Sequence, residues 1–327
     1  MKPLNKLLTL FTVVILLQSC TQSKPGWWKN EQISSGKRED FHQLNTVALK
    51  CLKDDNYKFL KTLVSKELME SNYTIRQAES ISNRLNANDY TLFDEYYAIN
   101  KWKSADTIIN KVVNKNSYNL YYGGVAREMY LAFFLPKNGN NKWMITLIYA
   151  KFNYGWKISQ MDVEPYTING KTAPELFDLA KQEQAKNYYS NTETTMELAG
   201  LCSRPNDFWL YTNDTQINEF RHQSLTEANQ HIKVPLVIDG VSSHPRIFRI
   251  ATEKTAQGTY PMIYYQTSVN LTNIDAIKKE HEAIKKVIGK LIPGIDKDND
   301  YLIYTAFNKL PNSSESVDRY EIDDKLR

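Results

Sequence analysis

The chain has 327 residues, 42% of them apolar and 24% charged, a composition typical of a soluble globular protein with about two domains. Its formal net charge of +4 gives no electrostatic reason to expect nucleic acid or another polyanion as a partner. Because only three cysteines are present, the chain is not a disulfide scaffold.

The N-terminus has the parts of a secretory leader in the right order. Lys2 and Lys6 supply a positive region, and residues 7–17 form an apolar run. This run is too short to cross a bilayer as a helix, which takes about 20 residues. It ends in Leu17-Gln18-Ser19-Cys20, a small residue directly before a cysteine.

This ending resembles the lipobox of bacterial lipoproteins. The resemblance implies that residues 1–19 are a signal peptide, that the Cys20 thiol receives a diacylglyceryl group, and that the new amine receives a fatty acid such as palmitate. Membrane lipid is then bound through Cys20, because two or three acyl chains are enough for stable attachment. Residues 21–24 hold no acidic signal, and by the same resemblance this favours the periplasmic face of the outer membrane.

Residues 20–37 are predicted to form a polar tether. Within it, Trp27 and Trp28 have two interpretations. Their indoles could rest at the level of the lipid headgroups, where amphipathic rings are favoured. Alternatively, both rings cap the core of the first domain.

Residues 38–190 are predicted to form a first α+β domain, which begins with helices. Apolar residues recur at helical spacing in three segments: 39–53, 57–68 and 75–85. Cys51 lies on the apolar face of the first segment, so it is interpreted as a core residue and not as a nucleophile. The segment 90–102 has irregularly spaced aromatic residues, which do not distinguish a helix from a strand.

An antiparallel meander is predicted over residues 117–165. Four extended runs rich in aromatic and β-branched residues are separated by three turn signals: Gly123-Gly124, Asn138-Gly139 and Tyr154-Gly155. The third run is apolar on both faces, as expected for an inner strand. After the meander, Thr172 and Glu175 form a capping box that predicts a helix to about residue 189.

Helices followed by a curved meander resemble the NTF2-like and cystatin-like folds, over residues 39–166. Members of these folds include isomerases and dehydratases with an acid in a cone-shaped cavity, and binding modules without chemistry. By this resemblance, Tyr149, Asp162 and Glu164 are the candidate pocket residues. Asp162 and Glu164, at the end of a strand before Pro165, also fit a solvated position, and we expect that placement.

Residues 195–310 are predicted to form a second, mixed α+β domain, after a polar boundary at 188–195. Its predicted helices are 215–231 and 274–292, and its predicted strands are 198–202, 234–238, 247–252, 260–271 and 301–307. Residues 311–327 are predicted to be a polar tail.

No catalytic signature is recognised, because the chain has neither a GxSxG nor an HExxH motif and its five histidines lack metal-ligand spacing. We therefore expect no catalytic residue, no metal and no cofactor. The expected function is non-catalytic binding or assembly at the cell envelope, with an unknown envelope protein or a small ligand as partner. The alternatives are a small-molecule enzyme in an NTF2-like cone and a structural component of an envelope complex.

Overall fold

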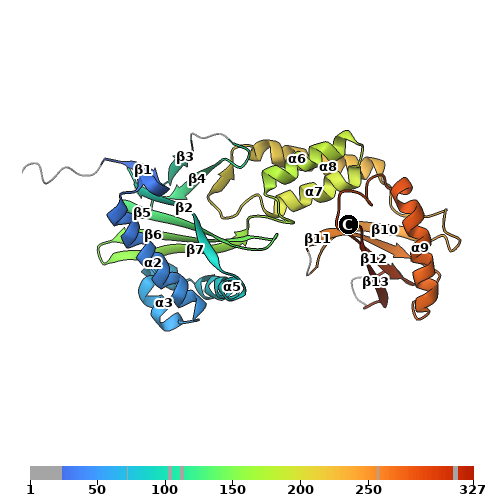
Figure 1. The fold of residues 1–327 in the computed structure, drawn as a ribbon, viewed down its shortest axis with the longest axis horizontal. Coiled ribbons are helices and arrows are strands. Elements are labelled where there is room, and N and C mark those ends of the chain that lie inside the picture. The colour runs from blue at the N-terminus through green and yellow to red at the C-terminus, as the bar shows by residue number, and fades with distance from the viewer. Residues whose placement is uncertain (1–23, 72, 102–104, 111–113, 256–257, 312–315) are drawn as a thin grey trace, which may run out of the picture.

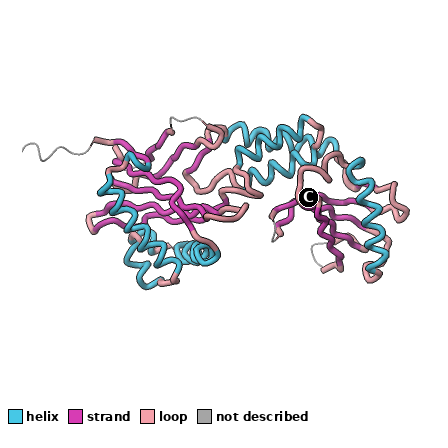
Figure 2. Tube along the Cα trace, viewed as in Figure 1, coloured by secondary structure: helices cyan, strands magenta, loops and turns pink. Residues whose placement is uncertain are grey.

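The computed structural model describes residues 24–327 apart from 72, 102–104, 111–113, 256–257 and 312–315. Cys20 and the predicted signal peptide therefore lie outside the described residues. The described chain is a mixed α+β protein with eight α-helices and three sheets, extended along one axis (Figure 1). Two sheet-containing parts lie at the ends of this axis, and a group of helices lies between them (Figure 2).

The N-terminal part is built on a five-stranded antiparallel sheet, here called sheet A. Its strands in spatial order are β1 (Gly26–Lys29), β2 (Tyr90–Ile99), β5 (Glu128–Pro136), β6 (Trp143–Phe152) and β7 (Gly155–Pro165). Strands β5, β6 and β7 confirm the last three runs of the predicted meander, because they pair antiparallel in chain order. The ambiguous aromatic segment supplies β2, which lies between β1 and β5.

The first run of the predicted meander belongs to a different sheet, and this part of the prediction was wrong. β4 (Tyr118–Gly123) pairs with β3 (Ala105–Ile109) and β8 (Trp209–Tyr211), forming sheet B. A glycine turn marks where the chain changes direction but does not say which strand pairs next. Sheet B packs on one face of sheet A, where Trp209 is buried between Tyr118 and Phe133.

Helices cover the other face of sheet A (Figure 1). They are α2 (Ser35–Lys53), α3 (Tyr57–Leu63), α4 (Lys66–Met69) and α5 (Tyr73–Ala87), preceded by the 3-10 turn η1 (Asn30–Gln32). The three predicted helices are thus confirmed, although the second is split. Val64 bridges to Ile158 on β7, and the Ser65 side chain caps α4, so the helix stops and restarts there.

Sheet A therefore has a core on each face, and both cores bear on predictions made from the sequence. Trp27 packs on the sheet B side, and Trp28 stacks on Tyr97 on the helix side, which confirms the core-capping interpretation. Cys51 and Cys202 are free and buried, in core clusters on opposite faces of sheet A.

Three helices follow sheet A: α6 (Ala173–Ala185), α7 (Tyr189–Leu201) and α8 (Asp214–His231). The capping box predicted at the start of α6 is confirmed, because the Thr172 N–H donates to Glu175 Oε2 at 2.9 Å. The strand predicted at 198–202 was wrong, because those residues lie in α7 and its C-cap. The polar stretch 188–195 is also helical, and its serine, threonine and asparagine side chains are buried.

The C-terminal part is a five-stranded mixed sheet covered on one face by α9 (Ile274–Leu291). Its strands in spatial order are β13 (Arg319–Lys325), β12 (Tyr301–Phe307), β11 (Thr259–Gln266), β10 (Arg246–Lys254) and β9 (Leu236–Val237). β11 and β12 are parallel and are connected through α9, while the other pairs are antiparallel. The residues that form β13 were predicted to be a polar tail. Exposed side chains alternate there with half-buried ones and with the buried Asp324 along an edge strand, so the composition looked like that of a loop.

Candidate functional site

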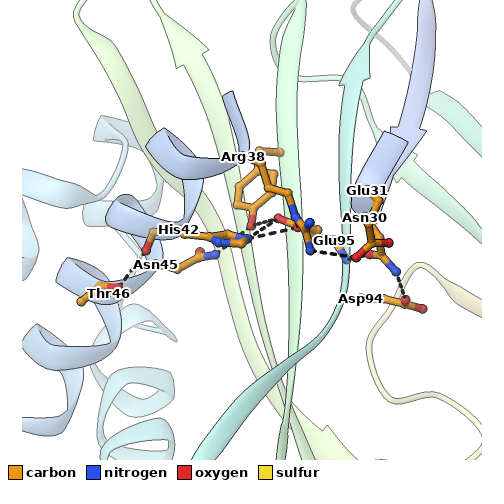
Figure 3. A network of polar contacts seen from close by, with 9 residues as sticks. Asn30, Glu31, Arg38, His42, Asn45, Thr46, Asp94 and Glu95 are labelled. Carbon is orange, nitrogen blue, oxygen red and sulfur yellow. Dashed lines mark hydrogen bonds and ion pairs between the residues drawn. The ribbon is translucent and has the colours of Figure 1, made fainter. Parts of the chain in front are cut away.

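A network of polar contacts around the Glu95 carboxylate joins α2 to sheet A (Figure 3). Glu95 is fully buried, and its Oε1 accepts a hydrogen bond from Arg38 Nε at 2.5 Å. His42 Nε2 lies 3.1 Å from both carboxylate oxygens, and the Tyr130 hydroxyl donates to Oε2 at 2.7 Å. Asn45 Nδ2 donates to the Tyr130 hydroxyl oxygen at 2.8 Å. Arg38, His42 and Asn45 can all reach the same point because they lie on one face of α2.

Asp94, the residue before Glu95, has a separate set of partners. Its Oδ1 accepts from Asn30 Nδ2 at 2.9 Å, while its Oδ2 lies 2.7 Å from Lys29 Nζ and also accepts from the Tyr118 hydroxyl. Asn30, with φ of 48°, accepts the Glu95 backbone N–H at 2.9 Å, so one side chain ties both acids together. Burial alone would lower the pKa of Lys29, but its hydrogen bond to Asp94 and nearby negative charges raise that pKa overall.

This arrangement suits the positioning of a helix better than catalysis. The Glu95 carboxylate is closed to solvent and is already engaged by an arginine, a histidine and a tyrosine, so it has no free approach to a substrate proton. Removal of one partner of a buried ion pair typically costs about 3–5 kcal/mol. We therefore assign the network to holding α2 against sheet A.

A cavity of about 410 Å³, here called the α2 cavity, lies between α2 and sheet A. Its lining is mostly apolar and consists of Phe41, Leu44, Val47, Ala48, Leu63, Tyr149 and Trp156, with Lys37, Asp40 and Gln43 as polar members. Phe41 connects the cavity to the Glu95 network, because its ring stacks on Tyr130 with centroids 4.1 Å apart. The volume lies within the range of about 300–1,000 Å³ found for small-molecule sites.

Tyr149 is the polar group that distinguishes this cavity. The residue is only 3% exposed, and its buried hydroxyl has no hydrogen-bond partner among the described residues. Burial raises the pKa of Tyr149, so the hydroxyl is protonated at physiological pH and can donate a hydrogen bond. A buried hydroxyl without a partner costs about 1–3 kcal/mol, which an acceptor on a bound molecule would offset.

The structure does not bring the three predicted pocket residues together. Tyr149 belongs to the core cluster on the helix side of sheet A. Asp162 is paired in register with Thr146, whose hydroxyl accepts from Asn206 in the loop before β8. Within the described chain no hydrogen bond links Tyr149 to Asp162 or Glu164, and neither acid lines the α2 cavity.

The expectation that Asp162 lies at a solvated strand end was wrong, because its side chain is buried with 4% exposure. Burial is the main cause that raises the pKa of Asp162, and the charge of Asp207 adds to it, while hydrogen bonds from the Val163 N–H and from Gln77 oppose it. Glu164 is half-buried, and burial followed by the charge of Asp162 raises its pKa as well. The residues that bury this strand end come from α5 and from the loop before β8, far away in sequence.

The sequence reasoning missed Arg38, His42 and Glu95. Two signals could have pointed to them. Asp94 and Glu95 interrupt an aromatic run, and acids within a buried strand need partners. Arg38 and His42 lie four residues apart at the start of a predicted helix, where they can reach one common acceptor.

Three further findings bear on function. Across the described ranges, no group of three or more His, Cys, Asp or Glu side chains is placed to hold a metal ion. None of the described helices has both the length and the apolarity to cross a membrane. Comparison of the chain with protein-family models, curated proteins and solved structures gives no match.

Proposed function

We propose that this chain is a lipid-anchored cell-envelope protein that binds a small, largely apolar ligand in the α2 cavity without transforming it. One observation carries the binding role: Tyr149, whose buried hydroxyl has no partner among the described residues, lines a cavity whose other walls are mostly apolar. Such a cavity suits a ligand with an apolar body and one hydrogen-bond acceptor. The proposed lipid anchor is supported by the lipobox-like sequence that ends at Cys20. The lack of acidic residues at positions 21–24 supports a location on the periplasmic face of the outer membrane.

The arrangement of helices and sheet supports a relationship to the NTF2-like or cystatin-like folds. In this proposal, α2, α3 and α5 close one face of an antiparallel sheet, and the ligand lies between the two layers. The same geometry weakens the enzyme alternative, because Asp162 and Glu164 are outside the cavity that contains Tyr149. Glu95 does not line the cavity either, and the hydrogen-bonding capacity of its carboxylate is already used.

The anchor is tested by Cys20→Ala. We expect the variant to leave the membrane fraction or to accumulate as an uncleaved precursor, because acyl chains supply the attachment. Cys51→Ala is the matched control, since Cys51 is a buried core residue and its loss should not change fractionation. Continued membrane association of a cleaved Cys20→Ala chain would show that lipid at this position is not the anchor.

The ligand site is tested with two small probes of similar shape, acetophenone and ethylbenzene, of which only acetophenone accepts a hydrogen bond. Binding to the purified full chain in detergent is measured by ligand-observed NMR. We expect both probes to bind and acetophenone to bind about fivefold more tightly, the effect of one hydrogen bond of about 1 kcal/mol. Tyr149→Phe should remove that difference.

Two exposed helical residues supply matched variants for the cavity. Val47, which is 43% exposed, lines the α2 cavity, while Ile75, at 55%, lies on α5 outside it. Val47→Trp should fill the cavity and abolish binding of both probes, whereas Ile75→Trp should leave binding unchanged. Equal loss in both variants, or no preference for acetophenone in the wild type, would refute the proposed site.

A further inference from the structure

A second cavity lies between α7, α8 and β10, far from the α2 cavity, and is here called the α7–α8 cavity. Its volume is about 470 Å³. The residues that carry the argument are Glu193, Glu197, Leu201, Arg221, Leu225 and Thr252, all of which line it. Since they come from two helices and a strand of the C-terminal sheet, folding brings them together from three separate segments.

Two carboxyl groups share this cavity. Glu193 and Glu197 lie one helical turn apart on α7, and their side chains are hydrogen-bonded to each other. Burial, followed by the charge and hydrogen bond of Glu197, raises the pKa of Glu193 to about 8. Thr252 Oγ1 also donates to Glu197 Oε2 at 3.1 Å. The raised pKa of Glu193 favours its protonated form at neutral pH, which relieves the repulsion between the two carboxyl groups.

A guanidinium group faces the same space. The Arg221 side chain crosses α7 at Gly200, where a Cβ atom would lie only 2.2 Å from Nη1. Glycine at this position is therefore needed for Arg221 to adopt its place. Arg221 has no hydrogen bond or ion pair from its side chain to any described residue, so its donors are free for a ligand.

The cavity also has an apolar wall. Leu201 is 56% exposed and Leu225 is 49% exposed, and both line the cavity. The cavity therefore presents two carboxyl groups from α7 and a guanidinium group from α8 beside this apolar wall. A ligand with only one charge would satisfy one group and be repelled by the other, whereas a ligand with both charges complements the two.

We propose that the α7–α8 cavity binds a small zwitterionic amino compound with an aliphatic body, such as a free amino acid. Its ammonium group binds the Glu193–Glu197 pair, its carboxylate binds Arg221, and its aliphatic part covers Leu201 and Leu225. Charge-assisted hydrogen bonds to arginine are directional and strong, so the carboxylate sets the orientation of the ligand.

Three related probes separate these contributions: L-leucine, L-leucinamide, which lacks the carboxylate, and N-acetyl-L-leucine, which lacks the ammonium group. Their binding to the purified full chain in detergent is measured by isothermal titration calorimetry. We expect L-leucine to bind and each of the other probes to bind at least about tenfold more weakly, the effect of losing one charged hydrogen bond. Equal binding of all three probes, or no binding of L-leucine at about 10 mM, would overturn the proposal.

Two glycine substitutions test the role of Arg221 without removing it. Gly200→Ala should displace the flexible guanidinium group and weaken L-leucine binding at least about tenfold, while the helix itself tolerates alanine well. Gly36→Ala in α2 is the matched control, since a Cβ atom there meets nothing within 4 Å. Circular dichroism checks that both variants fold. Unchanged L-leucine affinity in a folded Gly200→Ala chain would show that Arg221 does not bind the ligand.

Discussion

Tyr130 and Tyr149 allow a direct comparison of how much a buried hydroxyl group contributes to stability with and without a hydrogen-bond partner. They face each other in register on β5 and β6, their ring centroids are 5.7 Å apart, and they are 0% and 3% exposed. The Tyr130 hydroxyl donates to Glu95 and accepts from Asn45, whereas the Tyr149 hydroxyl has no partner in the described chain. Removal of the two hydroxyl groups should therefore have different consequences for stability.

Tyr130→Phe deletes a hydrogen bond to a charged group, worth about 1.5–3 kcal/mol, and leaves the Asn45 amide without its acceptor. We expect a loss of about 3 kcal/mol in the free energy of unfolding. Tyr149→Phe deletes a polar group that makes no bond, so we expect no change or a gain of up to about 1 kcal/mol.

The assay is urea denaturation of both variants and the wild type in one buffer, followed by near-ultraviolet circular dichroism, which reports on the packed tyrosines. The predicted difference between the two variants is about 3 kcal/mol. A loss of similar size in both variants would show that the Tyr149 hydroxyl does have a stabilising partner. That result would also remove the observation on which the ligand-binding proposal depends.

Two more predictions concern buried positions elsewhere. Glu183 is 2% exposed, and burial is the main cause that raises its pKa from 4.5 to about 7. Between these values the carboxyl is protonated in the folded chain and ionised in the unfolded chain, so stability should fall by about 2 kcal/mol as pH rises from 5 to 7. Glu183→Gln should abolish this fall in denaturation curves measured across that range, and an unchanged slope would refute the assignment. Ile145→Asp should cost more than about 4 kcal/mol, because Ile145 is fully buried on an inner strand, and a melting temperature equal to that of the wild type would contradict its placement.

The parts of the fold that could be predicted from the sequence are those in which one local pattern dominates. The helical stripe of α9 and the three strands β5, β6 and β7 were recognisable because their apolar residues follow the period of the element. β4 had the right local pattern, but its partners β3 and β8 are chosen by tertiary contacts. The polar N-terminal half of α7 has the composition of a linker, and its sequence therefore predicted a domain boundary. Its side chains are buried because their partners are distant in sequence: Asn191 donates to the carbonyl oxygens of Gly294 and Lys297.

The candidate site was harder to predict for a related reason. Tyr149 was identified, but its cavity is completed by α2, about a hundred residues earlier in the chain. Asp162 appeared solvated because the strand ends at a proline soon after it, yet Asp207 and Gln77 lie against it in the fold. Glu95 was not predicted as a site residue because its partners, Arg38 and His42, are polar residues of a helix, and such residues normally face water. Sequence periodicity indicates which face of an element is buried and is silent about which polar groups meet there.

If Cys20 is acylated, the position of β1 limits how far the protein can move from a membrane. β1 is an edge strand of sheet A and begins at Gly26, six residues after Cys20, a length of chain that spans at most about 20 Å. Trp27 and Trp28 are half-buried and pack against the two cores of sheet A. With Cys20 acylated, a short linker connects the lipid to one end of the long axis of the molecule (Figure 1). The α2 cavity would then lie within reach of molecules that leave the bilayer, while the C-terminal sheet, at the far end, would meet the contents of the aqueous compartment.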